Sequence, residues 1–134
     1  MKLKNILVPI DFSDFSYNAL VYSFFLAEKF KANITVIHVV SLYSESFTEK
    51  DQLGKVDKFI EEHEQKRKQM LENTRKKAKI KGRSFETKLI RSLSISGGIL
   101  DFIKENNFDM VVMGNHGNTG LKKFFAGSVS ERVL

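Results

Sequence analysis

Short apolar runs alternate along the chain with longer segments in which apolar residues recur every three or four positions. Four runs predict strands, over residues 6–10, 34–40, 85–91 and 110–113. The first two are apolar at nearly every position and rich in β-branched residues, which is typical of strands buried on both faces of a parallel sheet. Pro9 has no N–H to donate, so we expect it near the end of its strand.

The segment after the first strand has the pattern of a helix that packs on a sheet. Ser13 or Asp14 is a suitable N-cap, because a short polar side chain can accept from the free N–H groups of the first turn. The pattern extends to residue 30 with an inward stripe of Ala19, Tyr22, Ser23, Leu26, Ala27 and Phe30. Aromatic residues on helical spacing are expected in the core, here Phe24, Phe25, Phe30 and Phe59.

Three further helices are expected. The first covers about residues 51–80 and ends at Gly82, after a polar loop over residues 41–50. The second begins at Ser96 or Gly97, and a last one begins at Ser128 after a glycine-rich stretch. Strands that alternate with helices predict an α/β fold, an open parallel sheet sandwiched by helices.

Length and composition agree with one globular domain over residues 1–134. Hydrophobic residues make up 42% and charged residues 28%, which excludes a wholly disordered chain. The absence of cysteine excludes disulfides and thiolate metal sites. No apolar run approaches the ~20 residues of a membrane span, so the cytoplasm is the expected location. The apolar stripe that starts at Val129 is incomplete at Leu134, so we expect the natural chain to continue into a fifth strand.

The net charge of +6 is concentrated in one segment. Residues 64–83 contain nine Lys or Arg and two Glu, a local balance of +7. Such a run is usually the solvated face of a helix. The alternative is an electrostatic patch for nucleic acid or anionic lipid. No aromatic residue interleaves with these charges, as a stacking platform for single strands would require, so nucleic acid is not an expected partner.

Two loops have the chemistry of a ligand site. Open α/β sheets bind ligands at the carboxyl ends of their strands, where the strand order reverses. The loop after the first strand contains Asp11, and the loop after the fourth runs from Gly114 to Ser128. Glycines let the backbone approach a ligand closely, and unpaired N–H groups at a helix start attract an anion. The loop is neither a P-loop nor a dinucleotide fingerprint, because it lacks the lysine of the former and follows the wrong strand for the latter.

Several spaced motifs resemble the ATP-binding universal stress proteins. Gly114 is followed after two residues by Gly117, and after nine more by Gly127-Ser128. The resemblance extends to Ile-Leu-Val-Pro-Ile-Asp-Phe-Ser over residues 6–13, to His38-Val39, and to residues 109–117 and 127–134. It covers both ends and the core strands but not residues 41–83. It implies a Rossmann-like, adenine-nucleotide-binding topology. It also implies a stress-response regulatory module that binds ATP, with Mg²⁺ bridging phosphate oxygens.

The resemblance also assigns residues on the nucleoside side. Asp11 is expected to contact adenine or ribose, in a pocket lined by Pro9 and Ile10. The backbone of Val39 is expected to read the edge of the adenine.

On the phosphate side, the resemblance places Met113 and Gly114 beneath the ribose and phosphates. His116 and Gly117 would approach the phosphates, and the start of the last helix would cradle them through Gly127, Ser128, Val129 and Ser130. Two departures stand out: Leu93 occupies a position where the family often has glycine, and the family's closing strand is missing. That strand often pairs two protomers, so the family pattern implies a homodimer or a tandem partner domain.

Each assignment has a plainer alternative. Asp11 is also a good turn or capping residue, and His38 is also a hydrogen-bonded core or pocket-floor histidine. His116 has no visible carboxylate partner, so no catalytic residue is assigned. ATP binding is therefore expected to dominate over turnover, with slow hydrolysis or autophosphorylation left open. The rival interpretations are a phosphoryl-transfer enzyme with a second substrate and a dimerising stress protein without nucleotide.

Overall fold

Strands and helices alternate along the chain as the sequence pattern predicts. The computed structural model describes residues 2–41 and 53–114, except for the side chains at positions 53–57 and 59. The elements are β1 (Asn5–Pro9), α1 (Asp14–Phe30), β2 (Asn33–Ser41), α2 (Leu53–Ile80), β3 (Glu86–Ser92), α3 (Ile95–Glu105) and β4 (Met110–Val111). No helix in these ranges combines the length and apolar character needed to cross a membrane.

The four strands form one parallel sheet in the order β3-β2-β1-β4. Ile6 is paired with Ile34 of β2 on one side and with Met110 of β4 on the other. The chain builds outward from β1 to β3 and then returns to add β4 on the opposite side of β1. The strand order therefore reverses between β1 and β4. Pro9 is the last residue of β1, as its missing N–H predicts.

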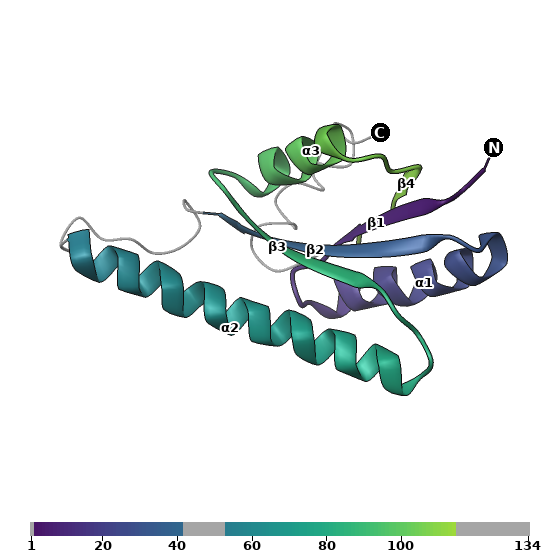
Figure 1. Cartoon of the computed structure of the whole chain (residues 1–134), viewed down its shortest axis with the longest axis horizontal. Coiled ribbons are helices and arrows are strands. Elements are labelled where there is room, and N and C mark those ends of the chain that lie inside the picture. The colour runs from purple at the N-terminus through teal and green to yellow at the C-terminus, as the bar shows by residue number, and fades with distance from the viewer. Residues whose placement is uncertain (1, 42–52, 115–134) are drawn as a thin grey trace.

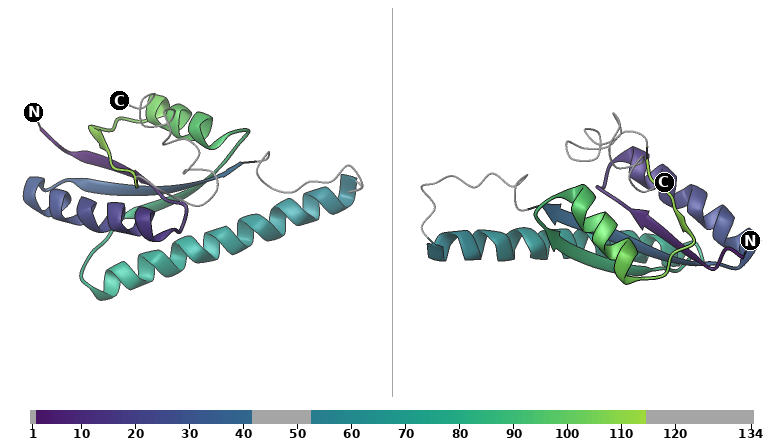
Figure 2. Two further views of the ribbon diagram at one scale, coloured as in Figure 1. Left: turned by 180° about the vertical axis from the view of Figure 1, so that it is seen from behind. Right: turned by 90° about the horizontal axis from the view of Figure 1, so that it is seen from above.

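Helices cover both faces of the sheet. In Figure 1, α1 and α2 lie on one face and α3 on the other, and α2 runs well past the edge of the sheet. The same layers appear in the two further views of Figure 2. The side chains of β1 alternate between two cores: Ile6 and Val8 pack on the side of α1 and α2, and Leu7 packs with Ile99 of α3. The sheet is therefore buried on both faces, which confirms the predicted α/β sandwich.

Serine side chains cap the helices that follow β1 and β3. The Ser13 hydroxyl accepts the N–H of Ser16 at 3.2 Å, so α1 begins where the sequence predicts. The Ser94 hydroxyl accepts the N–H of Gly97 at 3.0 Å and caps α3. The predicted start at Ser96 or Gly97 is therefore slightly late, because an earlier serine in the same run provides the cap.

The inward face of α1 differs from the predicted stripe. Tyr22 is 60% exposed and Phe30 is 46% exposed, whereas Ser23 is buried as predicted and Ser16, outside the predicted stripe, is buried too. The Ser23 hydroxyl donates to the carbonyl of Ala19 at 2.8 Å, which satisfies it inside the core. Small inward residues let α1 approach the sheet, while Tyr22 and Phe30 lie outward and Phe24 packs partly buried against the core. Phe25 is exposed as well, so the prediction of a Phe-rich core on α1 is wrong for Phe25 and Phe30, while the side chain of Phe59 lies outside the described residues.

Candidate functional site

The carboxyl ends of the four strands meet at one edge of the sheet, because all strands are parallel. This edge contains the switch point between β1 and β4, where α/β sheets place their ligands. The loop from β1 to α1 and the residues after β4 both begin here.

Asp11 shapes the loop after β1. Its Oδ1 accepts the N–H of Ser13 at 3.0 Å and also the Ser13 hydroxyl. Its own N–H donates to the Ser16 hydroxyl at 3.4 Å. Asp11 is thus a turn residue, as one of the two interpretations of the sequence predicts; contact with a ligand stays a prediction.

Phe12 takes a strained backbone conformation within this loop. Its φ of 66° lies in the left-handed region, which few residues other than glycine adopt. Such strain persists only where surrounding contacts enforce it, and it is common at binding sites. The motif around Asp11 and Ser13 predicts a turn, but nothing in the sequence signals the conformation of Phe12.

His38 of β2 contacts the loop between β1 and α1 through Ile10 and Phe12. Its Nδ1 lies 2.7 Å from the carbonyl oxygen of Ile10, and its ring lies 4.6 Å from the ring of Phe12. Burial lowers the pKa of His38, although the hydrogen bond to Ile10 opposes this effect. The ring is therefore neutral at pH 7 and donates from Nδ1 to the carbonyl. This confirms the prediction of a hydrogen-bonded histidine in the core or on the pocket floor.

Gly114 brings the chain after β4 against the start of α1. A Cβ at this position would lie 2.7 Å from both the carbonyl carbon and the carbonyl oxygen of Phe15. A side chain does not fit at that distance, so the close approach of two backbones requires glycine here. The residues after β1 and those after β4 thus share one corner of the molecule.

Val39 directs its side chain away from this corner. A Cβ added to Gly98 of α3 would lie 2.7 Å from Val39 Cγ1, so the valine packs on the α3 face together with Met113. The carbonyl of Ile37 accepts the N–H of Ile10 at 2.8 Å, toward β1. Backbone groups alternate along a strand, so those of Val39 point the same way, past the last residue of β1.

The start of α1 is poorly suited to bind phosphate. The N–H of Ser16 already donates to the Ser13 hydroxyl, and Asp14 adds a negative charge to the first turn.

Leu93, which follows β3 at the carboxyl edge, is 61% exposed, and its carbonyl accepts a hydrogen bond from the Ser41 hydroxyl at 3.1 Å. Its φ is not in the left-handed region, so this position does not require glycine.

Six of the twelve predicted site residues are among the residues that the structure describes. Pro9, Ile10, Asp11, Val39, Met113 and Gly114 all lie at the carboxyl ends of the strands or just beyond. The phosphate-side residues His116, Gly117, Gly127, Ser128, Val129 and Ser130 lie outside the described residues. Across residues 2–41 and 53–114, no group of three or more His, Asp or Glu is arranged to hold a metal ion.

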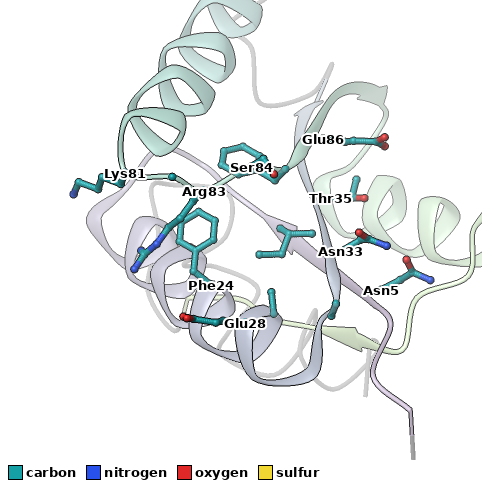
Figure 3. A pocket seen from close by; sticks show the side chains of 14 residues that line it. Asn5, Phe24, Glu28, Asn33, Thr35, Lys81, Arg83, Ser84 and Glu86 are labelled. Carbon is teal, nitrogen blue, oxygen red and sulfur yellow. The ribbon is translucent and has the colours of Figure 1, made fainter.

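A wide hollow of about 950 Å³ lies at the amino edge of the sheet, opposite the carboxyl edge (Figure 3). The sequence did not indicate this hollow. It is lined by the amino ends of the strands, including Asn5, Asn33 and Glu86, and by the turn that contains Arg83. The Arg83 side chain lies along the ring of Phe24 at its margin.

Comparison with known proteins places the chain in a family. The model of the universal stress protein family matches residues 2–134. The chain belongs to the universal stress protein family.

Relatives of this family share most of the chain. Universal stress protein MJ0531 of Methanocaldococcus jannaschii is 29% identical over 131 residues, which are 98% of this chain and 75% of the relative. Universal stress protein YxiE of Bacillus subtilis is 32% identical over 132 residues, covering 95% of this chain and 88% of the relative. The solved structure of UspA from Lactobacillus plantarum has the same fold, with a TM-score of 0.77 at 20% identity, covering 99% of this chain and 91% of that one.

Proposed function

We propose that this universal stress protein is a cytoplasmic regulatory module that binds ATP with Mg²⁺ at the carboxyl edge of its sheet. The observation that carries the proposal is the contact of Gly114 with the backbone of Phe15. It brings the loop that begins the glycine motif next to the loop that contains Asp11. These are the two loops that the family resemblance assigns to the phosphates and to the nucleoside.

The backbone of Val39 supports the nucleoside side of this proposal. Its amide and carbonyl point past the end of β1, and within the described residues no hydrogen bond from that side reaches them. A donor and an acceptor side by side match the edge of an adenine ring. Pro9 and Ile10 are buried and provide an apolar wall beside them.

The polyphosphate is then expected to bind to the glycine motif rather than to the start of α1. The first turn of α1 carries Asp14 and a serine cap, which disfavour an anion. The amides around Gly127 and Ser128 remain the proposed phosphate cradle, with Val129 and Ser130 beside them. Mg²⁺ would bridge phosphate oxygens, as it usually does in nucleotide sites.

The hydrogen bonds of Asp11 and His38, two titratable residues near the switch point, favour ATP binding over ATP turnover. Asp11 accepts two hydrogen bonds from Ser13, and Nδ1 of His38 is bonded to Ile10. Phosphoryl transfer needs a positioned base and charge clamps, and both of these groups already maintain the loop.

Calorimetric titration of the full chain with Mg-ATP, ADP and AMP tests the proposal. We expect saturable ATP binding, weaker binding of AMP, and a loss of roughly tenfold or more in Asp11→Ala, since a charge-assisted hydrogen bond contributes about 1.5–3 kcal/mol. Gly117→Val is expected to weaken ATP and ADP more than AMP, because a side chain would obstruct the phosphates.

Two controls separate contact from folding. Asp101→Ala removes an exposed carboxylate from α3 and should leave affinity unchanged. Ser13→Ala breaks the same turn and cap without removing the Asp11 carboxylate. If Ser13→Ala reduces affinity as much as Asp11→Ala, Asp11 acts only through the loop. No ATP affinity in the wild type would support the dimerising protein without nucleotide instead.

A further inference from the structure

A second concave site lies between α1 and α2, on the face of the sheet opposite α3. It is a cleft of about 280 Å³, and we refer to it as the α1–α2 cleft. Leu20 and Phe24 from α1 and Ala78 from α2 form its apolar floor, and Lys77, Lys81 and Arg83 stand at its rim. An apolar floor with a few polar groups at the margin is the usual construction of a small-molecule site.

The floor has no polar group that needs a partner. The Tyr17 hydroxyl lies 3.2 Å from the Thr74 hydroxyl, which in turn donates to the carbonyl of Met70 at 2.9 Å. This chain of hydrogen bonds closes one end of the cleft. An occupant therefore has to be apolar along the floor.

Arg83 is held in place by the turn that ends α2. Gly82 has a φ of 73°, and the N–H of Arg83 donates to the carbonyl of Ala78 at 2.9 Å. The guanidinium group lies 4.8 Å from the ring centre of Phe24 and 5.7 Å from that of Phe25. These ring contacts hold the guanidinium at the rim of the cleft, where its N–H groups can donate to a carboxylate.

Among the described residues, no ion pair joins a cation at the rim to a carboxylate. The ion pairs that the structure shows, Glu72 with Arg75 and Glu64 with Arg91, involve no residue that lines the cleft. Glu28 lines the neighbouring hollow together with Arg83 but makes no ion pair with it (Figure 3). A half-buried arginine that is held in place and makes no ion pair within the part of the chain that the structure describes is complementary to an anion.

The cleft joins the wide polar hollow at the amino edge of the sheet. Phe24, Lys81 and Arg83 line both. An anionic group at this junction would touch the cations and remain hydrated, while an apolar body lies over the floor. From Tyr17 to Phe24 the helix rises roughly 10 Å at ~1.5 Å per residue, about the length of a medium-chain acyl group.

We propose that the α1–α2 cleft binds a small amphiphilic anion, a free medium-chain carboxylate whose tail lies on Leu20, Phe24 and Ala78 and whose carboxylate pairs with Arg83. The inference is independent of ATP binding, because the cleft lies on a different part of the molecule from the switch point. The basic segment ends beside the exposed Phe25 of α1, a neighbourhood that the sequence alone did not predict.

Sodium octanoate added to the isotope-labelled full chain is the probe, with amide chemical shifts as the readout. We expect saturable shifts at Leu20, Ala78 and Arg83. Octanol, with the same tail and no charge, should bind roughly tenfold more weakly, as the loss of a charge-assisted hydrogen bond predicts. Acetate, with the charge and no tail, should not saturate. Absence of saturable octanoate shifts at the cleft would overturn the proposal, as would acetate binding as well as octanoate.

Variants test the head-group assignment. Arg83→Gln should weaken octanoate roughly tenfold, and Lys68→Gln, an exposed charge elsewhere on α2, should leave it unchanged. Val21→Asp places a carboxylate at the wall of the cleft, on a residue already 43% exposed, and should abolish binding without removing Arg83. Equal affinity in wild type and Arg83→Gln would refute the assignment. If the protein sediments with phosphatidylglycerol vesicles but octanoate causes no saturable chemical-shift change, the occupant is the lipid bilayer instead.

Discussion

The two edges of the parallel sheet differ in how closely their parts approach one another. At the carboxyl edge, Gly114 meets the backbone of Phe15 without room for a Cβ, Asp11 accepts hydrogen bonds from Ser13, and Nδ1 of His38 is bonded to the carbonyl of Ile10. At the amino edge, the same strands border a hollow of about 950 Å³. The switch point between β1 and β4 lies at the carboxyl edge, which we call the tight edge. The turns from α1 to β2 and from α2 to β3 border the hollow at the amino edge, which we call the open edge.

Under the proposed function, the ligand site lies at the tight carboxyl edge and not at the wide hollow. The wide hollow carries side chains of mixed charge and follows from the spacing between the ends of α1 and α2. The carboxyl edge gathers backbone groups from β1, β2 and β4 in one place. Strained backbone such as that of Phe12 clusters at functional sites, which is why the proposal favours this edge.

Substitution of Gly114 should have the largest effect on stability. In Gly114→Ala the new Cβ would lie 2.7 Å from the backbone of Phe15, so one of the two segments has to move. We expect a loss of about 1–3 kcal/mol in the free energy of unfolding, as for other overpacked sites. Urea denaturation measures it. An unchanged free energy would show that the two loops do not touch.

The open edge should tolerate a methyl group better. Gly82 has nothing within 4 Å of a Cβ, but its φ of 73° is unfavourable for other residues. Gly82→Ala should therefore lower the free energy of unfolding by about 1 kcal/mol through backbone strain alone. Asn accepts left-handed conformations more readily, so Gly82→Asn should lose less. Equal losses in the two variants would argue against strain as the cause.

These two glycines also illustrate how far sequence reasoning reaches. The strands, the Ser13 cap and the stop at Gly82 follow from local patterns, because each depends on neighbours within a few residues. The contact of Gly114 with Phe15, the outward rotation of Tyr22 and Phe30, and the position of Arg83 beside α1 depend on segments far apart in the chain. The predicted stripe of α1 included the buried Ser23 correctly, but helical spacing alone did not show that Tyr22 and Phe30 lie outside the buried face.

The stability of the carboxyl edge should depend on pH through His38. Burial lowers its pKa in the folded chain, so below the ordinary value of ~6.5 the unfolded chain binds a proton that the folded chain does not. Stability should therefore fall as pH drops from about 6.5 toward the lowered pKa. Arg67 opposes protonation and Asp11 favours it. Denaturation at pH 7.5 and 5.5 should show a larger loss in wild type than in His38→Gln; identical losses would contradict this origin.

The smallest effect is expected at Asp109, just before β4. Its carboxylate accepts the N–H groups of Lys4 and Asn5, each at 2.9 Å, and these bonds lower its pKa. The stabilisation is present above the ordinary pKa of ~3.9 and disappears as pH falls through the lowered value. The difference in stability between wild type and Asp109→Asn should thus shrink toward pH 3. Asp101→Asn on α3 is the control, and a similar trend there would implicate surface charge in general.

Amide chemical shifts during titration with Mg-ATP test the contrast between the two edges most directly. ATP binding at the switch point predicts saturable shifts at Asp11 to Ser16, at Val39 and at Gly114, with Phe24 and Arg83 unaffected. Shifts confined to Phe24, Arg83 and the amino edge, or no saturable shifts at all, would contradict the proposed nucleotide site.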